Sequence, residues 1–261
     1  MSFAVSGGDY GRFMGRYSEQ LAPAFADFAG VAARMRVLDV GCGPGALTAE
    51  LARRVGAERV AAADPAEHFV EACRARVPGA DVRVAPAEAL PFEDGSFDAA
   101  LAQLVFSFVP DAPAGAAEMR RVVSSGGAVA GCMWAAGDGM EMLRTFWGAA
   151  AALVDSDAGA AESRMRYRTR EELEELAESA GLTEVEIERL AVEARYEDFD
   201  DFWDPVASAP GPVGGSKPAS TTISARRSAR SAAGGWTTQA GRSHWARRPG
   251  RSAAAPEPRR N

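Results

Sequence analysis

The sequence has few of the features that mark a membrane-spanning, secreted or metal-binding chain. No apolar run reaches the roughly 20 residues that a membrane helix needs. The first residues lack the apolar stretch of a secretory signal. The three cysteines, Cys42, Cys73 and Cys132, are too widely spaced for a disulfide framework or a zinc motif. We therefore expect a cytoplasmic protein with no membrane partner and no metal site.

Lysine is almost absent, and the basic residues are unevenly distributed. Lys217 is the single lysine among 29 basic residues, a bias typical of GC-rich coding DNA. Residues 211–261 carry ten basic residues and one acidic residue, whereas residues 1–210 carry 19 basic and 35 acidic residues. The body therefore has a net charge of −16 and the tail a net charge of +9. An acidic body gives no support to nucleic-acid binding, so we expect no nucleic-acid partner.

The tail is also poor in large apolar residues. Residues 211–261 contain no Leu, Phe, Met, Tyr or Asp. Such a segment cannot bury enough apolar surface to offset the entropy of ordering, which predicts a disordered basic tail. A basic arm that binds nucleic acid or anionic lipid stays open as an alternative, although the basic residues share no helical face.

The body alternates strand-like and helix-like segments, which predicts an α/β fold with a parallel sheet covered by helices on both faces. The expected strands are 35–40, 59–64, 81–87, 97–109, 126–134 and 182–190. The expected helices include 46–55, 65–77, an apolar face over 142–154, and 170–180, which begins with a capping box at Thr169 and Glu172.

A glycine-rich turn follows the first strand, in the segment VLDVGCGPGALT over residues 37–48. Gly41, Gly43 and Gly45 leave no side chains to block a ligand beside this turn. The next helix directs its free N–H groups and its positive end at the same place. The spacing also fits the G-x-G-x-x-A dinucleotide fingerprint, so the turn alone does not choose between nucleotide cofactors.

Three features together resemble a known family. Asp39 precedes the glycines to give D-x-G-x-G-x-G, Asp64 ends the second strand, and APAEALPFEDGSFDAAL occupies residues 85–101. Over roughly residues 37–134 the chain resembles the class I S-adenosylmethionine (SAM)-dependent methyltransferases, especially the ubiquinone/menaquinone-biosynthesis type. The resemblance implies a doubly wound Rossmann-like sheet, SAM as cofactor and methyl transfer to a small-molecule acceptor.

The resemblance also implies roles for individual residues. The three glycines form the floor under the methionine part of SAM, Asp39 faces its ammonium group through water, and Asp64 holds the ribose hydroxyls. Ala87 and Glu88 lie beside the adenine, and Gln103 lies near the methionine end.

Structural alternatives stay open for four of these residues. Asp64 before Pro65 also suits a helix N-cap, and Asp39 suits a turn acid. Glu88 suits a solvated loop, and Gln103 suits a plain strand end.

The sequence says less about the acceptor site than about the cofactor site. Many members of the family carry a histidine in the stretch that corresponds to 105–109, but this stretch reads VFSFV here, and we name no catalytic residue. We expect an apolar acceptor pocket that includes Phe106 and Phe108, although both rings also suit core packing. The acceptor, the methylated atom and the oligomeric state are not readable from the sequence.

Three regions are expected along the chain. Residues 1–34 form an N-terminal helical lid with Tyr10 and Arg16 on its acceptor side, residues 35–210 form the SAM-binding domain, and residues 211–261 form the tail. Aromatic residues of the lid suit plain packing as well.

The family closes its sheet with an antiparallel strand near the C-terminus, and 211–261 contains no obvious strand of that kind. We interpret this tail as an out-of-frame translation that replaces the closing strand and leaves activity reduced or lost.

Two rival functions stay open. An NAD-dependent oxidoreductase with a Rossmann fold would use Asp64 equally well for the ribose. However, residues 1–210 contain no lysine to serve as its catalytic residue. A non-catalytic SAM-binding domain is the other alternative.

Overall fold

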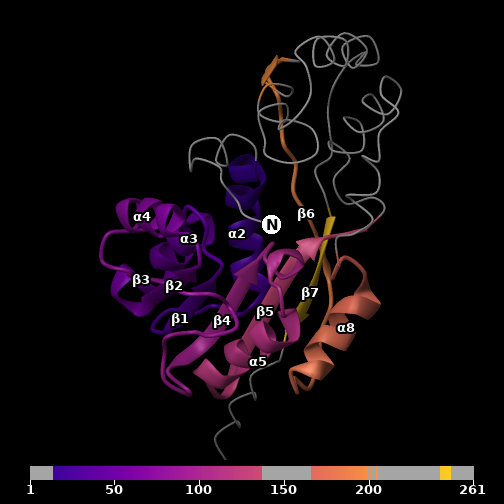
Figure 1. Ribbon diagram of the computed structural model, residues 1–261. Helices are drawn as coiled ribbons and strands as arrows, with labels where there is room; N and C mark the ends of the chain where they lie inside the picture. The colour runs from indigo at the N-terminus through magenta and orange to yellow at the C-terminus, as the bar shows by residue number, and fades with distance from the viewer. Residues whose placement is uncertain (1–13, 137–165, 199, 202–203, 205–241, 248–261) are drawn as a thin grey trace, which may run out of the picture.

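The computed structural model describes residues 14–136, 166–198, 200–201, 204 and 242–247 (Figure 1). Within them the strands form one seven-stranded sheet in the order β3-β2-β1-β4-β5-β7-β6. These strands are β1 (Val37–Val40), β2 (Val60–Asp64), β3 (Asp81–Val84), β4 (Phe97–Gln103), β5 (Val123–Trp134), β6 (Arg189–Ala191) and β7 (Arg242–Arg247). The helices are α2 (Arg16–Phe28), α3 (Ala46–Val55), α4 (Glu67–Arg76), α5 (Ala112–Val122) and α8 (Arg170–Ser179), with 3₁₀ turns η2 (Ala57–Arg59) and η3 (Phe106–Phe108).

The strand order reverses beside β1. This strand pairs in parallel with β2 on one side and with β4 on the other, so that Asp39 lies opposite Ala62 and Leu101. The carboxyl ends of β1, β2 and β4 therefore meet at one edge of the sheet. Open α/β sheets bind their ligands at such a switch point.

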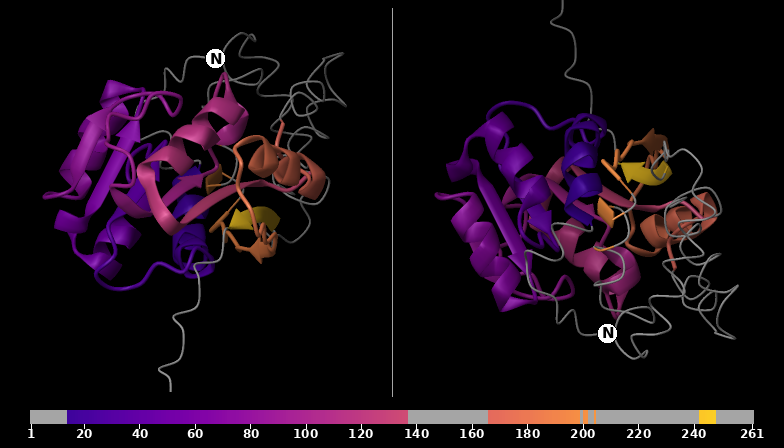
Figure 2. Two further views of the ribbon diagram at one scale, coloured as in Figure 1. Left: turned by 90° about the horizontal axis from the view of Figure 1, so that it is seen from below. Right: turned by 90° about the horizontal axis from the view of Figure 1, so that it is seen from above.

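Helices cover both faces of the sheet (Figure 2). Val37 packs in one cluster with Leu51 of α3, and its neighbour Leu38 packs in another with Met119 of α5. Successive strand residues point to opposite faces, so α2, α3 and α4 lie on one face and α5 and α8 on the other. The expected doubly wound, mostly parallel fold is confirmed.

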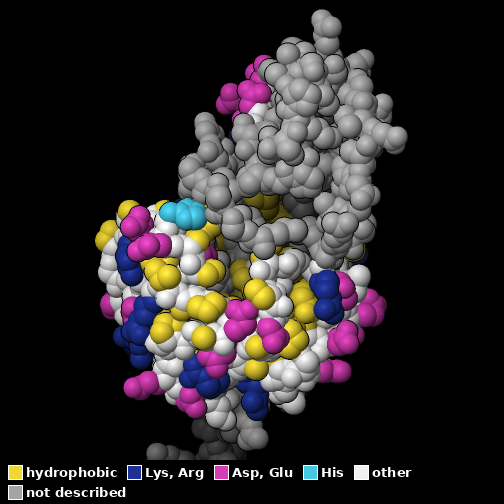
Figure 3. All heavy atoms as spheres, viewed as in Figure 1, with side chains coloured by type: hydrophobic (Ala, Val, Ile, Leu, Met, Phe, Trp, Pro, Cys, Tyr) yellow, Lys and Arg dark blue, Asp and Glu magenta, His cyan; other side chains and the backbone are white. Residues whose placement is uncertain are grey.

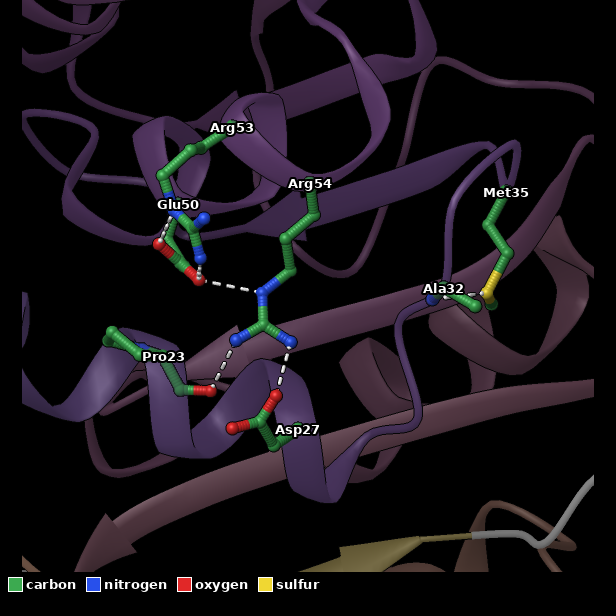
Figure 4. A network of polar contacts seen from close by, with 7 residues as sticks. All are labelled: Pro23, Asp27, Ala32, Met35, Glu50, Arg53 and Arg54. Carbon is green, nitrogen blue, oxygen red and sulfur yellow. Dashed lines mark hydrogen bonds and ion pairs between the residues drawn. The ribbon is translucent and has the colours of Figure 1, made fainter.

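Helix α2 is anchored on α3 by a shared guanidinium (Figure 4). Arg54 of α3 donates to the Asp27 carboxylate at 2.6 Å, to the Pro23 carbonyl at 2.8 Å and to Glu50 at 2.6 Å. The apolar side of α2, including Phe25, is buried in the same cluster as α3. The described part of the expected lid is therefore packed firmly against the body.

Several strand predictions were too long, among them 81–87, which ends at Val84, and the excess is largest for the fourth and sixth strands. The fourth strand ends at Gln103 rather than at 109, because Leu104 adopts a φ of +64° and the chain then turns through η3. Only the end of the expected strand 182–190 belongs to the sheet. It forms β6, which pairs with β7. The predicted capping box at Thr169 and Glu172 is confirmed, and the expected helix over 142–154 lies outside the described residues.

The expectation that 211–261 contains no closing strand is wrong for residues 242–247. Strand β7 runs antiparallel between β5 and β6, with Ala246 opposite Gly131 and Ser243 opposite Leu190. A strand ladder is built from backbone N–H and C=O groups, which any residue except proline supplies. The proline-free segment RSHWAR therefore forms the strand although it lacks an apolar run. The rest of the tail lies outside the described residues.

Candidate functional site

The glycine turn joins β1 to α3, and all three predicted glycines have positive φ angles, of 72°, 51° and 88°. A methyl group on Gly41 would lie 2.6 Å from Val105, and one on Gly45 would lie 2.9 Å from the Cys73 sulfur. A methyl group on Gly43 would meet no atom within 4 Å. Gly41 and Gly45 thus allow close packing inside the protein, whereas Gly43 leaves space open above the turn.

Asp39 is buried in β1 with one carboxylate oxygen satisfied. Its Oδ2 accepts a hydrogen bond from Thr48 Oγ1 at 2.6 Å, and its Oδ1 has no partner among the described residues. Burial raises the pKa of Asp39 to about 7, and the nearby Asp64 charge adds to the rise, while the Thr48 hydrogen bond opposes it. A buried acceptor without a donor is costly, so this oxygen is suited to a cationic or hydrogen-bonding ligand.

Asp64 is the last residue of β2, and its carboxylate binds the backbone of the glycine turn. Its Oδ2 accepts the Gly43 N–H at 2.9 Å, and its Oδ1 accepts the Ala66 N–H at 2.9 Å. Burial raises its pKa, and these two N–H donors oppose the rise. The N-cap of α4 is Ala66, so Asp64 is not the N-cap that the Asp-Pro pair suggested. A carboxylate has further lone pairs that can accept hydroxyl groups.

The remaining predicted cofactor residues border the same edge of the sheet. Ala87 is buried and packs close to Gly115 of α5. Glu88 Oε1 accepts the Asp111 N–H at 3.2 Å. At the end of β4, Gln103 Nε2 donates to the Ser18 carbonyl of α2 at 3.1 Å, and its buried Oε1 has no partner among the described residues. Gln103 thus ties α2 to the switch point.

The predicted acceptor residues are less closely grouped. Arg16 forms a bidentate ion pair with Asp201 at 2.5 and 2.8 Å. Phe106 is buried with its ring against Tyr167, whereas Phe108 is 43% exposed. Tyr10 lies outside the described residues. Phe106 therefore packs in the core, and Arg16 is occupied by its carboxylate partner.

No role was predicted from the sequence for Thr48, whose hydroxyl group donates a hydrogen bond to Asp39 in the structure. The signal was present in the spacing: the strand, the glycine turn and the first turn of α3 bring residue 48 back over residue 39. A hydroxyl nine positions after the strand acid is therefore a feature that could have been predicted.

The described surface carries charges of both signs. Figure 3 shows basic and acidic side chains interspersed over the face in view, with no extended basic patch on it. No group of three or more metal-ligating side chains was found among the described residues. None of the helices described is both long and apolar enough to cross a bilayer.

Comparison with known proteins agrees with this geometry. Residues 38–131 match the family model described as a methyltransferase domain. The chain is 32% identical over 155 residues to malonyl-[acyl-carrier protein] O-methyltransferase of Geobacter sulfurreducens, covering 58% of this chain and 57% of that protein. The chain spans about half the length of the curated relatives it matches.

Solved structures share the fold. YcgJ of Bacillus subtilis is similar with a TM-score of 0.56 and 16% identity, over 87% of this chain and 96% of that one. Geranyl diphosphate C-methyltransferase of Streptomyces coelicolor A3(2), solved with S-adenosyl-L-homocysteine, has a TM-score of 0.50 and 16% identity, over 87% and 76%.

The sheet order, the glycine turn and the two buried carboxylates define a nucleotide-binding α/β domain. Together with the family match, they identify residues 38–131 as a methyltransferase domain with the class I fold, for which SAM is the cofactor. Membership of the ubiquinone/menaquinone-biosynthesis type stays a prediction.

Proposed function

We propose that this protein transfers the methyl group of SAM to a small-molecule acceptor. The observation that carries the proposal is the Oδ1 of Asp39, which has no partner among the described residues, in the strand that leads into the glycine turn with its open space at Gly43. The unpartnered oxygen suits the ammonium group of the methionine part, and the open space suits a ligand lying against backbone.

Each residue has a role in binding or alignment. SAM supplies an activated methyl group on a sulfonium, so the protein has mainly to align the acceptor and exclude water. Asp39 accepts from the ammonium group, and Asp64 accepts from the ribose hydroxyls while it holds Gly43 in place. Ala87 and Glu88 border the adenine. Gln103 Oε1, which has no partner among the residues described, accepts a hydrogen bond near the methionine end.

The acceptor is a small molecule, and a carboxylic acid carried on a thioester is the first class to test. The support is the likeness to an enzyme named for methylating malonyl-[acyl-carrier protein]. The three cysteines are free thiols, which supports a cytoplasmic location.

The experiment is a calorimetric titration of the full chain with SAM, with S-adenosylhomocysteine and with NAD. We expect both sulfur nucleosides to bind and NAD not to bind. NAD binding without SAM binding would favour the oxidoreductase alternative. A second assay follows S-adenosylhomocysteine release with malonyl thioesters and a panel of small acids, alcohols and amines. Tight SAM binding with no turnover across the panel would favour the non-catalytic alternative.

A further inference from the structure

The β3–β4 segment, residues 85–96, is held against α5 by the guanidinium group of Arg121. An arginine side chain has five N–H groups, and that of Arg121 donates five hydrogen bonds. Their acceptors are the carboxylates of Glu118 (2.7 and 2.8 Å) and Asp94 (2.7 Å) and the backbone carbonyls of Leu90 (3.0 Å) and Phe92 (2.9 Å). Three of the five donors therefore reach the segment, and the other two bind a carboxylate of α5 itself.

Glu118 completes the hold on Leu90. Its Oε2 accepts the Leu90 N–H at 3.0 Å, so side chains of α5 bind both backbone groups of this buried residue. The hydrogen bond from Arg121 lowers the pKa of Glu118, although burial opposes this. The Gly95 N–H donates in turn to the Arg121 carbonyl at 3.0 Å. Since buried backbone groups need partners, these contacts do for the segment what a neighbouring strand does in a sheet.

The same side of α5 contacts the two residues that are expected beside the adenine. The Asp111 N–H, at the start of the helix, donates to Glu88 Oε1 at 3.2 Å. A methyl group on Gly115 would lie 3.3 Å from the Ala87 Cβ. Asp111, Gly115 and Glu118 are four and three residues apart, so they lie along one side of the helix. The β3–β4 segment therefore runs along this side of α5.

We propose that Arg121 and Glu118 are positioning residues for the cofactor: they hold the β3–β4 segment on α5, and the held segment keeps Ala87 and Glu88 in place beside the adenine. The adenine contact rests on the proposed function, whereas the hold on the segment stands on its own contacts. A segment that is already ordered loses less conformational entropy when a ligand binds, so its order raises the affinity for the ligand.

The hold depends on a guanidinium group and not on positive charge alone. The planar fork of Arg121 binds a carboxylate with two N–H groups and still directs three N–H groups to other acceptors. A lysine ammonium group has three donors at the end of a flexible chain. Arg121→Lys therefore keeps the charge but loses most of the contacts with the segment.

Arg53 of α3 provides a matched control. It also binds a glutamate three residues earlier through two hydrogen bonds, to Glu50 at 2.8 and 2.7 Å. Its side chain is 68% exposed, whereas that of Arg121 is 31% exposed. Arg53→Lys therefore alters the same kind of ion pair on another helix without touching the β3–β4 segment.

The first experiment measures amide hydrogen exchange in the ligand-free full chain. We expect peptides that cover residues 87–95 to exchange about tenfold faster or more in Arg121→Lys than in the unmodified protein, because the segment opens locally. Exchange there should be unchanged in Arg53→Lys, and peptides of β1 report any global unfolding. Equal exchange of the segment in all three proteins would overturn the hold and the positioning role.

The second experiment measures by calorimetry the affinity for S-adenosylhomocysteine and for S-inosylhomocysteine, whose base has an oxo group in place of the adenine amino group. We expect the unmodified protein and Arg53→Lys to prefer the adenosyl ligand by about tenfold or more, because groups held in place discriminate by hydrogen bonding. In Arg121→Lys the affinity for S-adenosylhomocysteine should fall roughly fivefold to tenfold, and the preference should shrink to about twofold. A purely structural role would lower the thermal midpoint and leave the preference unchanged.

The outcomes separate this inference from the proposed function. Unmodified protein that binds neither ligand would overturn the proposed function and the positioning role, while hydrogen exchange still decides the hold on the segment. Equal affinity of the unmodified protein for the two ligands, or a full preference in Arg121→Lys, would overturn the positioning role and leave the proposed function standing. Glu118→Ala removes the other half of the hold and should repeat the pattern of Arg121→Lys in both experiments.

Discussion

The two edges of the parallel strands are built from the same kinds of residue, yet they leave different groups unsatisfied. At the carboxyl edge, Asp64 accepts backbone N–H groups and Gly43 has a positive φ. At the amino edge, Asp98 accepts the Arg36 N–H at 2.8 Å, and Gly126 has a φ of +85° with open space beside it.

The difference lies in what is buried without a partner. Among the described residues, the carboxyl edge holds Asp39 Oδ1 and Gln103 Oε1, both buried and unpaired, whereas the Asp98 carboxylate at the amino edge is exposed to solvent. Water satisfies an exposed polar group, so only the carboxyl edge gains by binding a ligand. The location of the site follows from these unsatisfied atoms rather than from the glycines or carboxylates alone. The predictions below test this contrast and are ordered by their effect on SAM affinity.

The largest effect is expected from Gly43→Val. A branched side chain at this position fills the open space above the turn, and we expect SAM affinity to fall by about a hundredfold or more. Gly126→Val is the matched control, because it imposes similar backbone strain of about 1–2 kcal/mol at a positive φ. It should lower the thermal midpoint but leave SAM affinity unchanged in calorimetry. Equal SAM affinity for the two variants would contradict the assignment of the turn.

The next effect is expected from Asp64→Ala. The variant loses acceptors for two ribose hydroxyls, and charge-assisted hydrogen bonds of this kind contribute about 1.5–3 kcal/mol each. SAM affinity should therefore fall more than tenfold. Asp98→Ala removes a carboxylate that likewise accepts a backbone N–H, but at the other edge. It should cost about 1 kcal/mol in the free energy of unfolding and change SAM affinity less than twofold. If Asp64→Ala behaves like Asp98→Ala, Asp64 is structural.

Asp39 should make both stability and binding depend on pH. Its pKa is raised in the folded protein to about 7, so the folded state holds this proton more tightly than the unfolded state does. The contribution to stability is fully present below about pH 4 and is lost as pH rises through 7, a fall of up to roughly 4 kcal/mol in the free energy of unfolding. Denaturant unfolding of cofactor-free protein at pH 5 and pH 8 measures it, and Asp39→Asn should remove it.

Binding should follow the opposite direction, because a cationic ammonium group favours the ionised carboxylate. We expect the affinity for SAM to rise roughly fivefold to tenfold between pH 6 and pH 7.5, as Asp39 loses its proton. The rise should be absent in Asp39→Asn. An identical pH profile in the two proteins would assign the titration to another group.

The sequence was a good guide wherever local chemistry decides the structure. The bounds of α3 were predicted correctly, because apolar spacing and the glycine turn define them. The capping box at the start of α8 was also predicted correctly. The sequence was a poor guide where the partner is distant. Asp201, the partner of Arg16, lies 185 residues away in the sequence, and no local sequence pattern predicts this pair.

The closing strand is the clearest failure of that kind. Strand β7 owes its place to backbone pairing with β5 and β6, and its six residues carry no apolar alternation. Sequence patterns report the burial of side chains, so a strand held by its backbone ladder is not seen in them. The interpretation of the tail as out of frame stays a prediction, but the expectation that the tail leaves the sheet without a closing strand is wrong, because β7 pairs with β5.

The smallest effect on SAM affinity is expected from Ala246→Pro in β7. Proline removes one backbone N–H from β7 opposite Gly131 of β5, and a proline inside a sheet is tolerated essentially only at edges and bulges. We expect the free energy of unfolding to fall by about 1–3 kcal/mol. SAM affinity should change less than twofold at temperatures where the variant is folded, because β4 and β5 separate β7 from β1. Ala246→Ser keeps the N–H group and should match the unmodified protein in chemical denaturation. Equal stability of the proline and serine variants would mean that β7 contributes nothing to the sheet, and the tail would then be dispensable for folding.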